Sequence, residues 1–281
     1  MAETNGRVET RFWKRPNAKR ARRIVCLVAV LAPAIYFAPV VTLFLVLCGV
    51  IDVGRHRNVT YELIEKYFMG SGIGTWMLSP LNLVADLLSF ANPGIHKLED
   101  MPAEHRREIE ACVREFVANG DRVKAHMAKR LKQSRRGMLT FKWLNVRQDT
   151  ELRIPAFEGD YRYIQTIAVS AFNTRESTMR HFGPLRLTFR VLYNLEPANS
   201  REVFIEVDGR PHYWIDNPLF IFDDTMFHRS VNNVDGVRYC LFMDIVRPNY
   251  SRIAFNIAVG MVSVVGGSFK RFFYQNWSFM R

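Results

Sequence analysis

Cysteine is scarce in this chain and is not paired along the sequence. The four cysteines are Cys26, Cys48, Cys112 and Cys240, and no two of them form a CxxC motif. Two of them lie inside a long apolar run. This spacing disfavours a disulfide framework and indicates a reducing compartment.

Acidic residues are also few relative to basic ones. The 281 residues include 27 Asp and Glu against 39 Lys and Arg, which gives a net charge of +12 and a pI of about 9.8. Such an excess predicts an anionic partner, either nucleic acid or the surface of an acidic membrane. No recognised nucleic-acid-binding motif accompanies the charge, so we expect an anionic membrane surface and no nucleic acid. The length allows one good-sized domain with appendages, or two small domains.

Charge is absent altogether from one long segment near the N-terminus. The 28 residues from Ile24 to Ile51 contain no charged side chain, and roughly 20 apolar residues are enough to cross a bilayer as a helix. Pro33 and Pro39 interrupt this run, so we expect either one kinked span or a shallow hairpin. The basic block in front of the run predicts a cytoplasmic N-terminus. Residues 72–91 are also apolar but contain Asp86, which makes them a weak second span or an interfacial or helix-packing segment.

The composition divides the chain into five segments. They are a basic cytoplasmic tail, a membrane-embedded or membrane-associated region, a helical basic segment, a β-domain and a membrane-interfacial C-terminal segment, at residues 1–23, 24–92, 93–135, 136–250 and 251–281. The basic face of the helical segment is either solvated or in contact with lipid headgroups. In the last segment, aromatic residues such as Trp277 lie near basic ones such as Lys270. That mixture is typical of a membrane interface, and a helix that packs on the core is the alternative.

Beyond Thr150 the helical period gives way to short β-like runs. Strands are predicted at Ile164–Ser170, Leu187–Leu195, Val203–Val207, Leu219–Phe222 and Val237–Val246. Asp208-Gly209 after the third run is the signal of a tight hairpin turn. Many short strands separated by turns predict a sandwich, barrel or jelly roll. In the last run, alternation places Arg238, Cys240, Phe242 and Asp244 on one face, and an arginine on an apolar inner face requires an anionic partner.

Two histidines in this β-region suggest a metal centre. His181 and His228 are 47 residues apart, and neutral imidazoles are good ligands for Fe(II). Arg238 could clamp the distal carboxylate of a chelating keto acid through a charge-assisted pair, with a hydroxyl such as that of Ser170 beside it. Spacing alone leaves this open, because a single histidine is more often structural or exposed than a metal ligand.

The order of these residues adds a family resemblance. The motifs are Ser170, His181-Phe-Gly-Pro, Arg190, Phe222-Asp-Asp-Thr-Met-Phe-His228, Arg238 and Asp244-Ile-Val-Arg-Pro248. Together, over about residues 160–250, they resemble the aspartyl/asparaginyl β-hydroxylase family of Fe(II)/2-oxoglutarate dioxygenases. The resemblance implies a mainly β catalytic domain, a double-stranded β-helix or jelly roll with N-terminal membrane segments and flanking helices. It also implies that His181 and His228 bind iron, that Ser170 and Arg238 hold the distal carboxylate of 2-oxoglutarate, and that Arg190 reaches the cosubstrate or substrate.

Within that family, the chain is more similar to the bacterial lipid A acyl-chain 2-hydroxylases and ornithine-lipid hydroxylases. Phe204–Gly209, Ser79–Asn82 and the apolar N-terminus carry this closer likeness. Gly183 stands where the lipid A enzymes have the aspartate of a histidine-x-aspartate triad. We therefore expect water to fill the coordination position of that aspartate on the iron. Leu192 stands where the family has a histidine.

The adjacent pair Asp223 and Asp224 is read as a strand-end or turn feature and not as a source of the third iron ligand. Neighbouring residues on a strand point to opposite faces, so we expect one of the two carboxylates to face outward.

The resemblance implies a membrane-bound oxidoreductase that uses Fe(II), 2-oxoglutarate and O2 to hydroxylate a fatty-acyl chain of a bacterial membrane lipid, at C2. We expect it at the bacterial inner membrane with the catalytic domain on the cytoplasmic side. Two alternatives stay open: hydroxylation of an aspartyl or asparaginyl residue in a protein, and a catalytically silent membrane scaffold. The sequence does not indicate which lipid is modified or what the oligomeric state is.

Overall fold

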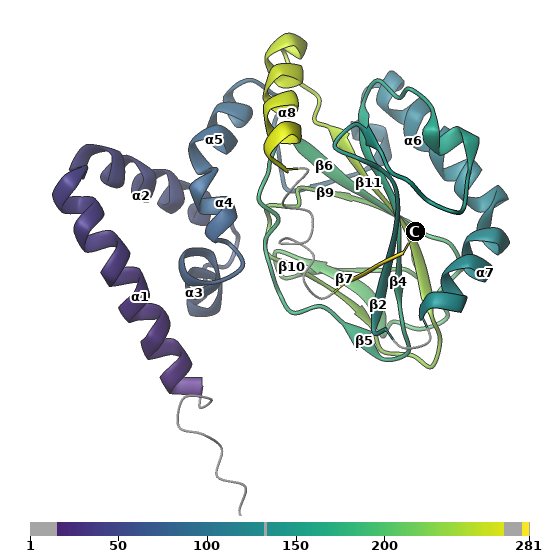
Figure 1. The fold of residues 1–281 in the computed structure, drawn as a ribbon, viewed down its shortest axis with the longest axis horizontal. Helices are drawn as coiled ribbons and strands as arrows, with labels where there is room; N and C mark the ends of the chain where they lie inside the picture. The colour runs from purple at the N-terminus through teal and green to yellow at the C-terminus, as the bar shows by residue number, and fades with distance from the viewer. Residues whose placement is uncertain (1–15, 132–133, 267–276, 281) are drawn as a thin grey trace, which may run out of the picture.

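The computed structural model describes residues 16–131, 134–266 and 277–280 (Figure 1). Its α-helices are α1 (Pro16–Phe37), α2 (Pro39–Gly54), α3 (Tyr61–Met69), α4 (Ile73–Met77), α5 (Ser79–Leu87), α6 (Ala103–Ala118), α7 (Gly120–Leu131) and α8 (Arg252–Gly266). Its strands are β1 (Ile95–His96), β2 (Arg136–Trp143), β3 (Val146–Arg147), β4 (Ile164–Phe172), β5 (Glu176–Ser177), β6 (Thr188–Asn194), β7 (Val203–Val207), β8 (Arg210–Tyr213), β9 (Leu219–Phe222), β10 (His228–Asn232), β11 (Arg238–Val246) and β12 (Ser278–Met280).

Two sheets form the centre of the molecule. The larger one has eight strands in the order β1-β9-β6-β11-β4-β2-β12, with β3 paired to β2, and the smaller one has the order β5-β10-β7-β8. All pairings are antiparallel except the one between β12 and β2. The prediction of a mainly β domain is therefore confirmed, and two facing antiparallel sheets are what a jelly roll requires.

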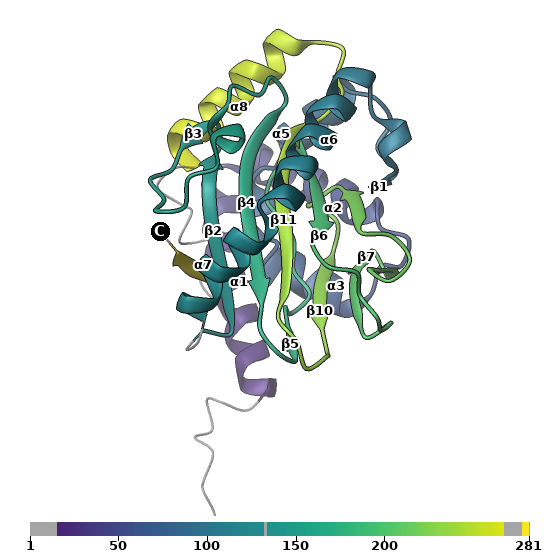
Figure 2. The same cartoon turned by 90° about the vertical axis from the view of Figure 1, so that its right-hand side faces the viewer.

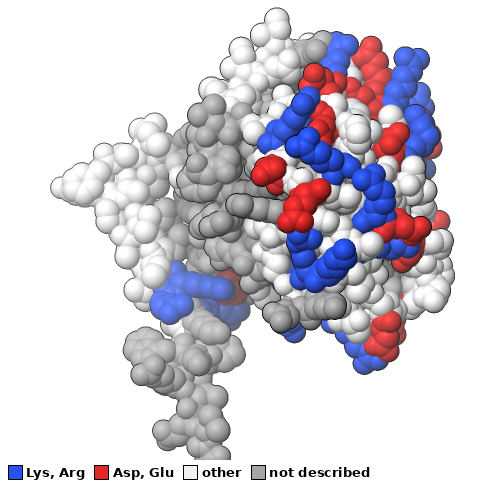
Figure 3. Space-filling view, turned by 45° about the vertical axis from the view of Figure 1, so that its right-hand side comes forward, with Lys and Arg blue, Asp and Glu red and all other residues white. Residues whose placement is uncertain are grey.

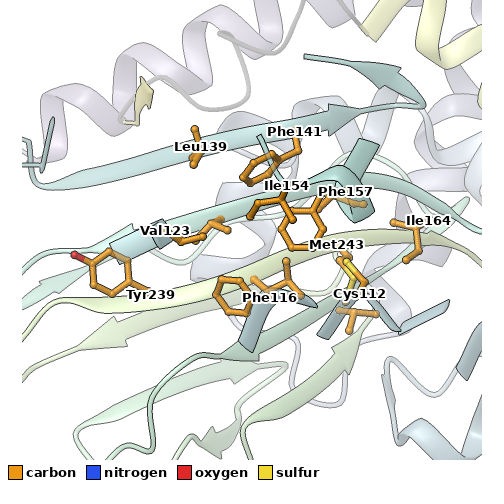
Figure 4. Close-up of a cluster of buried hydrophobic side chains, with 14 of the residues drawn as sticks. Cys112, Phe116, Val123, Leu139, Phe141, Ile154, Phe157, Ile164, Tyr239 and Met243 are labelled. Carbon is orange, nitrogen blue, oxygen red and sulfur yellow. The ribbon is translucent and has the colours of Figure 1, made fainter. Parts of the chain in front are cut away.

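The strands of the large sheet are apolar on both faces because each face packs against another layer. On β11, Tyr239, Leu241 and Met243 join the core beneath α6 and α7, and Figure 4 shows part of this cluster with Cys112 and Phe116 from α6. The alternate residues Cys240 and Phe242 join a second core with the residues of β7. This alternation confirms the predicted face of the last strand, and Figure 2 shows α6 and α7 lying across the outer face of the sheet.

The predicted strand positions agree closely with the structure where alternation is strong. The runs Val203–Val207 and Leu219–Phe222 are observed with the predicted bounds. Asp208 and Gly209 both have positive φ, 51° and 74°, which is the geometry of the tight hairpin turn that joins twisted strands. Glycine adopts this conformation without a steric penalty.

The long uncharged run near the N-terminus forms two helices and not one. Ala38 leaves helical geometry, with φ −142° and ψ 60°, and Pro39 begins α2. Within the described ranges no helix combines the length and the apolarity needed to span a bilayer. The predicted spanning helix is therefore not supported, because the uncharged residues are divided at Ala38. The apolar stretch 72–91 is likewise divided into α4 and α5.

Helices α3 to α5 pack against the β-domain. Leu63 and Trp76 share a buried cluster with Phe182 and Phe227, and Trp76 also donates a hydrogen bond to the carbonyl of Leu45 in α2 at 2.9 Å. Asn82 in α5 accepts from the backbone N–H of Arg186 at 2.9 Å. The helix-packing interpretation of this second apolar stretch is the one that the structure shows.

The basic face of α7 has local acidic partners. Lys124 pairs with Glu196 at 2.8 Å, and Arg130 pairs with Glu151 at 2.6 Å. Charges of both signs are mixed on the side of the molecule that carries α6 (Figure 3). These contacts favour the solvated interpretation of this face over lipid contact. In the C-terminal segment, residues 267–276 lie outside the described residues, and α8 packs Phe255 and Val259 on the β-domain.

Candidate metal centre

His181 and His228 lie side by side at one edge of the small sheet. Each donates its backbone N–H to the carbonyl of the other, at 2.9 Å and 3.0 Å. Their ring centroids are 4.2 Å apart. His228 is buried and His181 is half-buried. The structure thus brings together the two histidines that the sequence predicts as iron ligands.

Both imidazoles are fixed in the same way. Nδ1 of His181 lies 2.9 Å from the carbonyl of Met179, and Nδ1 of His228 lies 2.7 Å from that of Met226. A carbonyl accepts only, so each Nδ1 carries the proton and each Nε2 keeps a free lone pair. Burial lowers the pKa of His181 to about 3 and that of His228 to about 4. Both rings are therefore neutral at neutral pH, the form that binds metals.

The two neighbouring aspartates have different surroundings. Asp223 is fully buried and faces Arg186, Arg55 and Thr225. Burial by itself would raise the pKa of Asp223, but the two guanidinium groups outweigh it and hold the pKa below its usual range. Asp224 faces the histidines instead, with Oδ1 3.4 Å from Nε2 of His228. The expectation that one of the pair points outward is wrong, since both are buried.

Arg238 is a buried cation without an acidic partner among the described residues. It is 6% exposed, and its Nε has no hydrogen-bond partner in the part of the chain that the structure describes. Its Nη2 donates to the hydroxyl of Ser230 at 2.6 Å, and its guanidinium lies 4.4 Å from the ring centroid of Phe172. Burial lowers the pKa of Arg238, yet an arginine stays protonated at neutral pH. A buried charge of this kind requires an anion.

Ser230 is a candidate site residue that the sequence reasoning missed. His228 and Ser230 lie opposite Val207 and Ile205 of β7, which belong to the core between the sheets. The two residues therefore face the interior, about 7 Å apart along the strand. The sequence signal for Ser230 is its position two residues after His228, because residues at i and i+2 of a strand face the same side. Ser170, the predicted partner of Arg238, donates its hydroxyl to the carbonyl of Cys240 at 3.2 Å.

Arg190 faces the same interior and is held by two carboxylates. Its Nη1 lies 2.5 Å from Asp224 Oδ1, while Nε and Nη2 lie 3.0 Å and 2.9 Å from Asp244 Oδ1. Leu192, two residues further on, packs opposite Phe220. The predicted reach of Arg190 toward a cosubstrate stays a prediction, as do the roles of the other site residues.

The donor set fits a divalent cation such as Fe(II). Two neutral imidazoles with free Nε2 atoms lie beside a carboxylate, a combination found in non-haem iron sites. Among the described residues, no cluster of three or more His, Cys, Asp or Glu side chains is already arranged as a metal site. Arg238, which has no acidic partner among the described residues, fits an acidic cosubstrate.

A buried ionic network lies behind the second histidine motif. The guanidinium of Arg186, 2% exposed, lies 2.9 Å from Asp52, 2.8 Å from Asp86 and 3.4 Å from Asp223. Arg247 joins it through Asp86 at 2.6 Å. The network links α2 and α5 to the loop that precedes His228, so the N-terminal helices help to hold that loop in place.

Known proteins resemble part of this chain. Ornithine lipid ester-linked acyl 2-hydroxylase from Rhizobium tropici is 28% identical over 116 residues, which cover 39% of this chain and 41% of that protein. The match thus spans less than half of the relative's length.

Two solved structures show weak similarity. An oxidoreductase of the 2OG-Fe(II) oxygenase family from Burkholderia pseudomallei is 18% identical, with TM-score 0.24, over 34% of this chain and 50% of its own. A sugar phosphate isomerase from a cupin superfamily, from Silicibacter pomeroyi, is 13% identical, with TM-score 0.25, over 41% of this chain and 73% of its own.

The family comparison coincides with the site. The model of the family described as aspartyl/asparaginyl beta-hydroxylase matches residues 152–248, a range that contains both histidines, Arg190 and Arg238. The resemblance that the motifs indicate is therefore confirmed over residues 152–248, which match the model of the aspartyl/asparaginyl β-hydroxylase family.

Proposed function

We propose that the protein is an Fe(II)/2-oxoglutarate-dependent dioxygenase that hydroxylates a fatty-acyl chain of a bacterial membrane lipid, at C2. The observation that carries the proposal is Arg238, a buried guanidinium with no acidic partner in the part of the chain that the structure describes. It lies on the same interior as two neutral histidines whose rings are already oriented. A metal-binding edge next to an anion-binding arginine suits a cosubstrate that chelates iron at one end and carries a carboxylate at the other.

Each residue has a defined task in this proposal. His181 and His228 hold the metal through Nε2, and their Nδ1–H groups keep the rings oriented by bonding to backbone carbonyls. Arg238, hydrogen-bonded to Ser230 and with Ser170 on the neighbouring strand, binds the distal carboxylate. Bound Fe(II) with 2-oxoglutarate and O2 supplies the oxidation, in which the keto acid becomes succinate and CO2 and one C–H bond becomes C–OH. The apolar inter-sheet core limits the access of water to the site.

Exposed apolar surface supports a lipid as the substrate. On α1 and α2, Phe37, Val40, Leu43 and Phe44 are 54–81% exposed, and no charged residue lies among them. In Figure 3 the projecting α1–α2 corner is free of charged residues. Such a surface fits the interfacial region of a bilayer, with the basic N-terminal residues at the headgroups.

The apolar helices are connected to the metal centre. Phe182 and Phe227 each adjoin a histidine in sequence and pack with α3 and α4. A bilayer bound by α1 and α2 would therefore lie close to the site. We infer a location at the cytoplasmic side of the bacterial inner membrane, where 2-oxoglutarate is available.

The test is succinate formation by the purified protein. Fe(II), 2-oxoglutarate and O2 are supplied with ornithine lipid or lipid A, and the product is checked by mass spectrometry for the gain of one oxygen atom. We expect His228→Ala to abolish substrate-dependent succinate, and His126→Ala, on the outer helix α7, to retain it. Full turnover by the His228→Ala variant would refute the metal assignment.

Hydroxylation of an aspartyl or asparaginyl side chain in a protein is the second candidate. The description of the matched family favours it. Comparison of lipid extracts from cells with and without the gene separates the two, since only a lipid hydroxylase changes acyl masses. A catalytically silent scaffold would show no iron uptake when the purified protein is titrated.

A further inference from the structure

We propose that Asp224 supplies the third protein ligand of the metal held by His181 and His228. This inference rests on the proposed function and deepens it. The carboxylate would come from the second histidine motif. It would fill the coordination position for which Gly183, having no side chain, supplies no ligand. Water would then not be needed as the permanent third ligand.

The first support is the space at Gly183. A Cβ added to this glycine would overlap Oδ2 and Cγ of Asp224, and would lie 2.9 Å from its carbonyl oxygen. The two segments are also joined by a hydrogen bond from the Gly183 N–H to the Asp224 carbonyl at 2.7 Å. The Asp224 carboxylate thus occupies the volume that an acidic side chain at position 183 would begin to fill.

The second support is the distance to His228. Oδ1 of Asp224 and Nε2 of His228 are 3.4 Å apart. Ligand bonds of about 2.1 Å place two donor atoms about 3.0 Å apart at a right angle and about 3.4 Å apart at a tetrahedral angle. One cation can therefore bind both atoms with little movement of either side chain.

The third support is the partner of Asp224. Arg190 holds Asp224 Oδ1 at 2.5 Å but also makes two contacts with Asp244. When Asp224 turns to a cation, Arg190 keeps Asp244 and is not left as an unpaired buried charge. Asp223 cannot take this role, because its carboxylate is engaged by Arg186, Arg55 and Thr225.

The test counts the waters on bound Mn(II) by electron paramagnetic resonance in water enriched in the magnetic oxygen isotope. The full chain is used in detergent micelles without 2-oxoglutarate. We expect Asp224→Ala to bind one more water than the wild type and to bind Mn(II) at least about 10-fold more weakly. Asp224→Asn, which keeps the shape of the side chain, covers the case in which the Ala variant does not fold. It should also bind Mn(II) more weakly.

Asp235→Ala is the control, because it removes an exposed carboxylate that pairs with Arg175 and should leave the water count unchanged. The same water count in the wild type and both Asp224 variants would overturn the proposal, and would assign Asp224 to holding a metal-bound water. Absence of Mn(II) binding by the wild type would instead overturn the proposed function itself, so the two failures are distinguishable.

Discussion

Replacement of Arg186 by Ala should be among the most destabilising single changes in the molecule. Its guanidinium is 2% exposed and lies within 3.4 Å of three carboxylates, those of Asp52, Asp86 and Asp223. Without it, the Tyr67 hydroxyl, which donates to Oδ2 of Asp52 at 3.0 Å, is the remaining side-chain hydrogen-bond partner of Asp52 within the described residues. A buried carboxylate that loses its cation is poorly compensated in a low-dielectric interior.

The expected loss in the free energy of unfolding follows from the burial of the carboxylates that pair with Arg186. Breaking a buried ion pair by removing one member costs about 3–5 kcal/mol. Asp223 retains Arg55 and Thr225, and Asp86 retains Arg247, so we expect a loss near the lower end, about 3 kcal/mol. For a chain of this size that corresponds to a fall in Tm of roughly 6–12 °C.

The assay is thermal and urea denaturation followed by circular dichroism, with Arg175→Ala as the control. Arg175 also pairs with an aspartate, Asp235, at 2.8 Å, but both side chains are about 70% exposed. Exposed pairs contribute less than about 1 kcal/mol. We expect Arg186→Ala also to weaken Mn(II) binding, because the network holds the loop before His228. A loss below about 1 kcal/mol for Arg186→Ala, equal to that of the control, would refute the reasoning.

Three further changes test other parts of the structure. Arg238→Ala should raise KM for 2-oxoglutarate by roughly 10- to 150-fold in the succinate assay, because a charge-assisted bond contributes about 1.5–3 kcal/mol; an unchanged KM would contradict the anion site. Gly49→Val should destabilise the fold by about 1–3 kcal/mol in urea denaturation, since an added Cβ meets Trp76 at 2.6 Å, and a wild-type midpoint would argue against this packing. Phe44→Asp, at a side chain that is 54% exposed, should lower binding to phosphatidylglycerol vesicles at least about 10-fold. Val146→Asp, at a side chain that is 57% exposed, should leave binding unaltered; equal losses would contradict a membrane role for α2.

Local patterning predicted much of the β-domain. Strict alternation in Val203–Val207 and the Asp208-Gly209 turn depend on neighbouring residues only, so the hairpin could be read from the chain. The apolar N-terminus was harder, because hydropathy reports that residues are uncharged and not where the backbone leaves the helix. The break at Ala38 depends on φ and ψ at one residue.

The residues of the site also fall into two groups, those that the sequence predicts and those that only the folded structure brings together. The two histidines and Arg238 were predictable because a family resemblance fixes their order. Arg186 was not, since its carboxylates at Asp52 and Asp86 are 134 and 100 residues away in sequence and only the folded chain brings them together. Asp223 and Asp224 look equivalent in sequence, and the structure separates them by what surrounds each carboxylate.

The mutual backbone bridge between His181 and His228 has a consequence for how the protein matures. The two histidines are 47 residues apart in sequence, and in the fold His228 is bridged to His181 and also lies opposite Val207 of β7. A slip of one residue would turn His228 and Ser230 to the outside of the small sheet while leaving the strand content nearly unchanged. Under the proposed function, metal uptake would therefore report the correct non-local pairing of the strands, and a misregistered chain would pass a test of secondary structure and still fail to take up the ion.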